Sequence, residues 1–119
     1  DSGSSFFLPK LVGPQKAFEL STMATKVSAQ EALEIGMVNK VVPLSSLDEA
    51  IKVYTDYYVN APTKAIGLMK KMLNKSFNSS LDEMLDYEAY CQEIAGRSED
   101  HKEGVQAFME KRKPDFKGK

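Results

Sequence analysis

The sequence GMVNKVVP, residues 36–43, contains the one stretch of this chain that predicts a β-strand. Val38, Val41 and Val42 are β-branched, and Pro43 ends the run. A single strand has no neighbour for its backbone N–H and C=O groups. We therefore expect the short strand near 38–42 either to join a sheet supplied by residues outside this chain or to lie as an isolated extended segment.

Helical patterns occupy the chain on both sides of this strand. Before it, a short helix over 4–12 is interrupted at Pro9 and is followed by helices over 14–24 and 29–35. After it, two amphipathic helices are separated by a break at Pro62, and two more cover 81–96 and 99–112. The expected fold class is mainly α, with about six helices and one short strand.

Helix starts are marked by serine caps. Three Ser-x-x-Glu capping boxes occur, at Ser28 with Glu31, Ser46 with Glu49, and Ser80 with Glu83. Ser98 is expected to cap the last helix, and Pro114 prevents that helix from extending.

The composition limits the class of protein. The 119 residues are 42% hydrophobic and 28% charged, with a formal net charge of −1, which argues against bulk nucleic-acid binding. Cys91 is the single cysteine and cannot form an intrachain disulfide, so nothing indicates an oxidising compartment. No apolar run approaches the ~20 residues that span a bilayer. We expect a cytoplasmic protein, or one of an organelle matrix, without nucleic-acid or membrane partners.

Asp1 is the first candidate for chemistry. It precedes a Gly-containing turn and an apolar run with Phe6 and Phe7, which we expect to be buried. A carboxyl in a partly apolar pocket has a tuned proton affinity and can serve as a general acid or base. The alternative is an ordinary exposed turn residue, which the pattern alone favours. The sequence begins with Asp1 and without Met, which suggests a piece of a longer protein.

Other reactive residue types have simpler interpretations. Lys111, Arg112 and Lys113 end a helix, where cations complement the macrodipole, although they also suit phosphate recognition. His101 is the single histidine and is expected to be a solvated surface residue, since one imidazole is too few for a metal site. Cys91 lies on an apolar helix stripe and is expected to be buried.

Four strings together resemble one family. They are residues 13–17 (GPQKA), 26–32 (KVSAQEA), 36–43 and 103–116 (EGVQAFMEKRKPDF). In order and spacing they are similar to the second half of the crotonase superfamily, the enoyl-CoA hydratases and isomerases. The resemblance covers the whole chain.

This resemblance implies a fold and an organisation. Residues 1–43 would form the end of the α/β spiral core, and residues 44–119 a C-terminal helical oligomerisation region that builds homotrimers or hexamers. The N-terminal half of the family binds coenzyme A and supplies the oxyanion hole. That half is the expected partner of this chain, which alone is expected to be inactive.

The resemblance also assigns roles to residues. Asp1 to Ser5 look like the turn where isomerase branches carry an acidic residue, closest to the phenylacetate-pathway epoxyphenylacetyl-CoA and enoyl-CoA isomerases. A related dehalogenase branch uses an Asp there as a nucleophile. Phe108 and Lys111 match positions that contact a neighbouring subunit's acyl-CoA. The substrate would be an acyl-CoA thioester, with no separate cofactor and no metal.

Two alternative functions remain at this point. One is an enoyl-CoA hydratase whose catalytic Glu lies upstream of residue 1. The other is a non-catalytic helical module for oligomerisation or binding, which the all-helical pattern and the many tyrosines favour.

Overall fold

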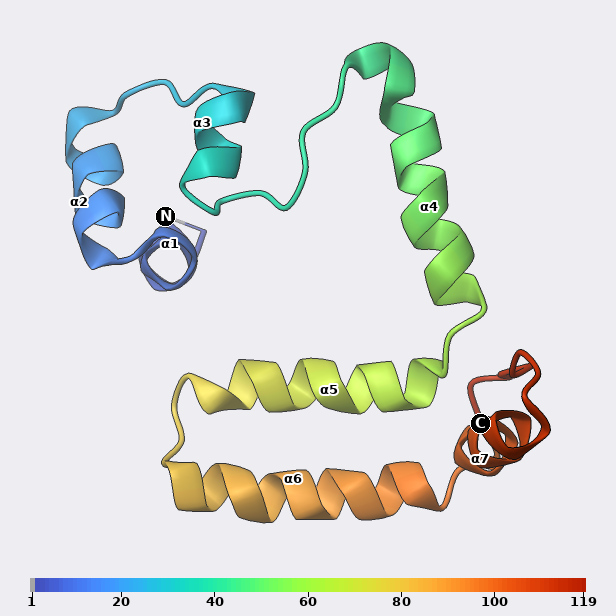
Figure 1. The fold of residues 1–119 in the computed structure, drawn as a ribbon. Coiled ribbons are helices and arrows are strands. Elements are labelled where there is room, and N and C mark those ends of the chain that lie inside the picture. Colours follow the sequence, from blue (N-terminus) through green and yellow to red (C-terminus); the bar gives the residue numbers. More distant parts are fainter. Residues whose placement is uncertain (1) are drawn as a thin grey trace. The chain divides into compact units, whose positions relative to one another are not determined.

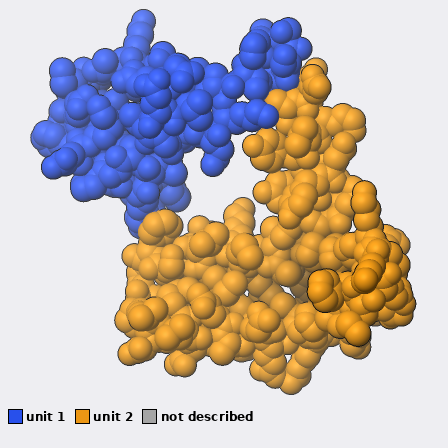
Figure 2. Space-filling view, in the orientation of Figure 1, with its two compact units in different colours: residues 1–47 blue, residues 48–119 orange. Residues whose placement is uncertain are grey.

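The computed structural model describes residues 2–119, and helices dominate them (Figure 1). The described residues form seven α-helices and one short 3₁₀ turn. The chain forms two compact units, residues 1–47 and residues 48–119 (Figure 2). The mainly α class predicted from the sequence is confirmed.

The first unit contains three short helices and the 3₁₀ turn. They are α1 (Ser4–Val12), α2 (Pro14–Met23), α3 (Ala29–Glu34) and η1 (Leu44–Ser46). Gly13 separates α1 from α2 with a φ of 80°, a left-handed value that glycine adopts without steric cost. Pro14 then occupies the first position of α2, where its missing N–H is no loss. The two helices pack against each other.

The predicted strand near 38–42 is wrong, since none of these residues forms a strand in the described chain. The N–H groups of Met37 and Val38 instead donate to the carbonyl of Ala32, at 2.8 and 3.2 Å. With Gly36 at φ 75°, the Met37 bond closes α3 in a Schellman motif. Asn39 lies in a bend, and residues 40–42 have no regular structure and no ladder partner in the described chain. A strand exists only through such pairing.

The second unit contains the longer helices. They are α4 (Leu47–Val59, whose first residue belongs to the first unit), α5 (Thr63–Ser76), α6 (Leu81–Gly96) and α7 (Glu99–Glu110). Figure 1 shows α5 and α6 side by side, joined by a tight turn, and both α5 with α6 and α6 with α7 are in contact.

The helix caps agree with the sequence at two of the three predicted boxes, at Ser80 fully and at Ser28 in part. At Ser80 the capping box is complete, because the Ser80 hydroxyl accepts from the Glu83 N–H and the Glu83 carboxylate accepts from the Ser80 N–H. At Ser28 the hydroxyl accepts from the Glu31 N–H. The 3₁₀ turn that includes Ser46 leads directly into α4.

Few side chains are buried in the described residues. The buried apolar residues are Ala17, Ala32, Ala61, Met84, Cys91 and Ala107. Cys91 is 2% exposed, as its position on an apolar stripe predicted. By contrast α4 buries no residue, and its Ile51, Tyr54 and Tyr57 are exposed. The described chain therefore leaves apolar side chains on the faces of its amphipathic helices exposed.

The complete capping box gives a first test of the fold. Replacing Ser80 by Ala leaves the Glu83 N–H in the first turn of α6 without its partner, so we expect the free energy of unfolding to fall by about 1 kcal/mol. Urea denaturation of the full-length protein measures this change. Ser79→Ala, just outside the helix, is the matched control, and an equal loss in both variants would contradict the capping role.

Candidate functional site

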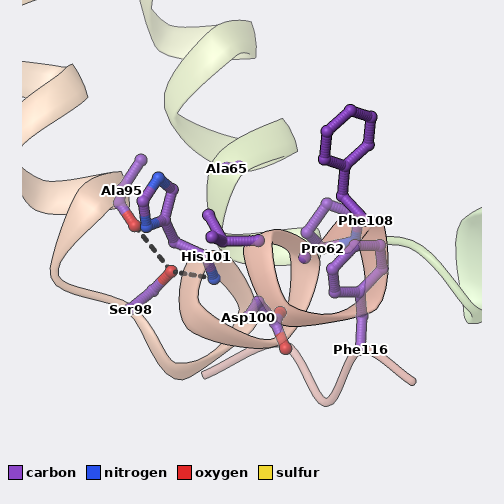
Figure 3. A pocket seen from close by; sticks show the side chains of 10 residues that line it. Pro62, Ala65, Ala95, Ser98, Asp100, His101, Phe108 and Phe116 are labelled. Carbon is purple, nitrogen blue, oxygen red and sulfur yellow. Dashed lines mark hydrogen bonds between the residues drawn. The ribbon is translucent and has the colours of Figure 1, made fainter. Parts of the chain in front are cut away.

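A pocket of about 400 Å³ opens in the second unit (Figure 3). The start of α5, the end of α6, the helix α7 and the C-terminal tail all contribute to its walls. The lining residues are Pro62, Ala65, Ala95, Ser98, Asp100, His101, Gly104, Val105, Phe108 and Phe116. The walls are mainly apolar, which suits the non-polar part of a small-molecule ligand.

Ser98 fixes the corner between α6 and α7. Its hydroxyl donates to the carbonyl of Ala95 at 2.6 Å and accepts from the N–H of His101 at 3.1 Å, and both bonds are drawn in Figure 3. This confirms the predicted cap. Because the same hydroxyl ties the last turn of α6 to the first turn of α7, it sets the angle at which the pocket walls meet.

Asp100 holds the C-terminal tail, residues 113–119, on α7. Its side chain is nearly buried, with the whole residue 3% exposed, and the carboxylate accepts from the N–H groups of Lys117 and Gly118 at 2.7 and 2.8 Å. The Asp100 N–H in turn donates to the carbonyl of Lys119 at 3.1 Å. A buried carboxylate is tolerated only with such partners, so the tail and Asp100 stabilise each other.

A second attachment lies further along α7. The guanidinium of Arg112 donates to both oxygens of Glu103, at 2.6 and 2.9 Å, and the Asp115 N–H donates to the same carboxylate at 2.7 Å. These donors, the Arg112 hydrogen bonds first, lower the pKa of Glu103 to about 2. The pKa of Arg112 is raised by its bonds to Glu103 and Glu110.

Phe108 and Lys111, predicted from the resemblance to contact acyl-CoA, lie one helical turn apart at the end of α7. Phe108 lines the pocket and is 82% exposed. Lys111 is exposed and has a left-handed backbone, φ 56° and ψ 36°, and its N–H donates to the Phe108 carbonyl at 3.2 Å. The structure thus places Phe108 on the pocket and Lys111 one turn further along the chain, and the contact of either with a ligand stays a prediction.

Asp1, the predicted acid or base, lies outside the described residues. The turn that follows it is described: Ser2 and Gly3 are both left-handed, with φ of 54° and 85°. A Cβ on Gly3 would lie 3.1 Å from the ring of Phe7, so glycine is required here for two reasons. The expectation that Phe6 and Phe7 are buried is wrong, since they are 48% and 60% exposed.

The sequence did not reveal the roles of Asp100, Glu103 and Phe116. An acidic residue in the first turn of a helix ordinarily complements the macrodipole, and the partners of Asp100 lie 17 and 18 residues later in a tail without periodicity. His101 is exposed, as predicted, but also lines the pocket.

Among the described residues, no group of three or more His, Cys, Asp or Glu side chains could hold a metal ion. None of the described helices is both long enough and apolar enough to cross a membrane.

Comparison with known proteins identifies the family. The family model described as Enoyl-CoA hydratase/isomerase matches residues 1–119. The chain belongs to this family. The membership predicted from the sequence strings is therefore confirmed.

Similar proteins in the enoyl-CoA hydratase/isomerase family carry different names. The chain is 37% identical over 119 residues to 1,2-epoxyphenylacetyl-CoA isomerase of Escherichia coli K12, covering 100% of this chain and 45% of that protein. It is 35% identical over 114 residues to crotonyl-CoA hydratase of Syntrophomonas wolfei, covering 96% and 44%. The crystal structure of enoyl-CoA hydratase from Bacillus anthracis superposes with a TM-score of 0.92 at 34% identity, covering 98% of this chain and 45% of that one. The chain thus spans less than half the length of these family members.

The pKa of Glu103 predicts how the tail responds to acid. Because the folded pKa is lowered to about 2, the stabilisation is complete above the unfolded pKa of about 4.3 and is lost as the pH falls through about 2. We therefore expect hydrogen exchange at the Asp115 amide, corrected for the intrinsic rate, to increase between about pH 4 and pH 2.

Glu103→Gln is the matched variant for this experiment. It removes the titrating carboxylate, so the Asp115 amide should exchange faster already at neutral pH and lose most of its acid dependence. Equal protection in both proteins over the whole range would show that Glu103 does not hold the tail.

Proposed function

We propose that the full-length protein processes an acyl-CoA thioester and isomerises it through an enolate, by moving a double bond or by opening an epoxide. The match of the whole chain to the enoyl-CoA hydratase/isomerase family carries this proposal. The similarity to a relative named 1,2-epoxyphenylacetyl-CoA isomerase favours isomerisation within that family. No cofactor beyond the substrate enters the proposal.

The proposed mechanism divides the work between two parts of the protein. Backbone N–H groups from an N-terminal half would hold the thioester oxygen while negative charge develops on it, and each such donor typically lowers a barrier by ~3 kcal/mol. Asp1 would move a proton between two carbons of the acyl chain. A single carboxyl suffices for such transfer, whereas hydration ordinarily uses two, one to activate water and one to deliver a proton.

The second unit would bind the CoA portion. Phe108 offers an exposed ring at the pocket edge, and Lys111 places an ammonium one turn further, within reach of a phosphate. We propose that these residues serve the acyl-CoA of a neighbouring subunit in a homotrimer or hexamer. The exposed apolar face of α4 is consistent with burial against another part of such an assembly. A cytoplasmic location remains part of the proposal.

Hydration is the second candidate reaction. The relative named crotonyl-CoA hydratase favours it, and it would use a Glu upstream of residue 1. The two reactions are separated by substrate: a hydratase adds water to crotonyl-CoA, which removes the conjugated absorbance, while an isomerase acts on a 3-enoyl-CoA without taking up water. A module for oligomerisation alone would do neither.

Asp1→Asn tests the proton carrier. In the full-length protein we expect kcat for 3-enoyl-CoA isomerisation to fall about 10²- to 10⁴-fold, because an amide cannot accept and return the proton. Asp48→Asn, an exposed carboxyl in the first turn of α4, is the control. An undiminished rate in Asp1→Asn would remove Asp1 from the mechanism.

Lys111→Ala tests the phosphate contact. We expect KM for CoA esters to rise by up to roughly tenfold with kcat unchanged, as one exposed charge contact of about 1 kcal/mol is lost. Lys113→Ala is the matched control, since it removes an exposed lysine two residues away beyond the helix end. If both variants raise KM equally, the effect is one of general charge and Lys111 has no specific role.

A further inference from the structure

We propose that Phe116 is a second aromatic contact for the nucleotide end of a CoA ester, and that Asp100 positions it by holding the C-terminal tail. This inference rests on the proposed function, because the ligand is the CoA ester proposed there. It assigns a binding role to a residue of the tail and a positioning role to a buried carboxylate.

The first step is the placement of the ring. Phe116 is half-buried and lines the same pocket as Phe108, and Figure 3 shows the two side chains on the same side of it. The ring of Phe116 lies against α7 at Gly104, where an added Cβ would be 3.4 Å from Cε1. The ring therefore packs at van der Waals distance from α7.

The second step is what holds the ring there. Phe116 has an attachment on each side: the Asp115 N–H donates to Glu103, and the N–H groups of Lys117 and Gly118 donate to Asp100. Gly118 has φ 74°, and a Cβ there would lie 2.5 Å from the hydroxyl oxygen of Thr63 at the start of α5. The tail is therefore attached to α7 on both sides of Phe116, and these attachments hold the ring beside α7.

The third step concerns the kind of ligand. Phe108, Phe116 and His101 all line the pocket, and aromatic side chains are the usual stacking partners of a planar aromatic ring. Lys111 lies one turn from Phe108 and suits a phosphate. In a CoA ester an aromatic ring and phosphates occur together only in the nucleotide end. We therefore assign the aromatic part of the pocket to the flat, weakly polar face of the adenine ring in that end of the ester.

Calorimetric binding of CoA and of 3′,5′-ADP to the full-length protein tests the ring. We expect Phe116→Ala to raise the Kd of both about tenfold, the loss typical of one stacked base, while Phe116→Tyr keeps most of the affinity. Met109→Ala is the control, an exposed apolar residue of α7 outside the pocket. An unchanged Kd for 3′,5′-ADP in Phe116→Ala, or the absence of 3′,5′-ADP binding to the unaltered protein, overturns the inference.

A double-mutant cycle tests the positioning role of Asp100. Asp100→Asn turns one acceptor oxygen into an N–H donor that faces a tail N–H, so we expect it to raise the Kd several-fold by freeing the tail. If Asp100 acts through Phe116, the double variant binds no more weakly than Phe116→Ala alone. Additive losses would show that Asp100 affects binding by another route and would overturn its assignment.

A failure of the inference about Phe116 can be distinguished from a failure of the proposed isomerisation. Binding of 3′,5′-ADP needs no turnover, so the contribution of Phe116 is measured even if Asp1→Asn leaves isomerisation unchanged. Conversely, an enzyme that isomerises CoA esters but has the same affinity for 3′,5′-ADP with and without the Phe116 ring retains the reaction and refutes this inference.

Discussion

The second unit depends on how the carboxylate of Asp100 is accommodated. A carboxylate removed from water loses its solvation, which is costly unless hydrogen-bond donors replace the lost water. In this fold two consecutive N–H groups of the tail are those donors. The tail has no regular hydrogen bonding of its own, so its order depends on Asp100 just as Asp100 depends on it. The pocket wall that includes Phe116 follows from this mutual dependence.

The left-handed Lys111 makes the second attachment possible. Glu103 and Arg112 are nine residues apart, a separation that would place them on distant turns of one continuous helix. At Lys111 the chain leaves the helix, and the Arg112 N–H donates back to the Ala107 carbonyl at 3.0 Å in a Schellman motif. The chain then runs back along α7, so the guanidinium reaches Glu103. A lysine in this conformation is more strained than glycine, which is reasonable if its ammonium binds a ligand.

Local signals were predictable from the sequence, and distant partners were not. The caps at Ser80 and Ser98 join groups three residues apart, so the sequence contains the whole interaction. The strand at 38–42 was wrong because β-branched composition reports only a preference for extended backbone, whereas a strand also needs a neighbour. The role of Asp100 was missed because its partners lie in the tail, and nothing in the spacing shows that the tail returns to the start of α7. The contact of Phe108 and Lys111 with acyl-CoA was predicted only from the resemblance of the sequence to a known family.

The two kinds of proposed site residue lie in different units of the chain. Asp1 belongs to residues 1–47, while Phe108, Lys111 and Phe116 belong to residues 48–119. Contacts to a nucleotide remain the same while bonds change in the acyl group, so their energy stabilises the bound substrate and the transition state equally and affects KM rather than kcat. A proton carrier contributes mainly in the transition state and affects kcat. Under the proposed function, variation in the tail would therefore tune affinity for CoA esters without altering the chemistry, which the residues around Asp1 would determine.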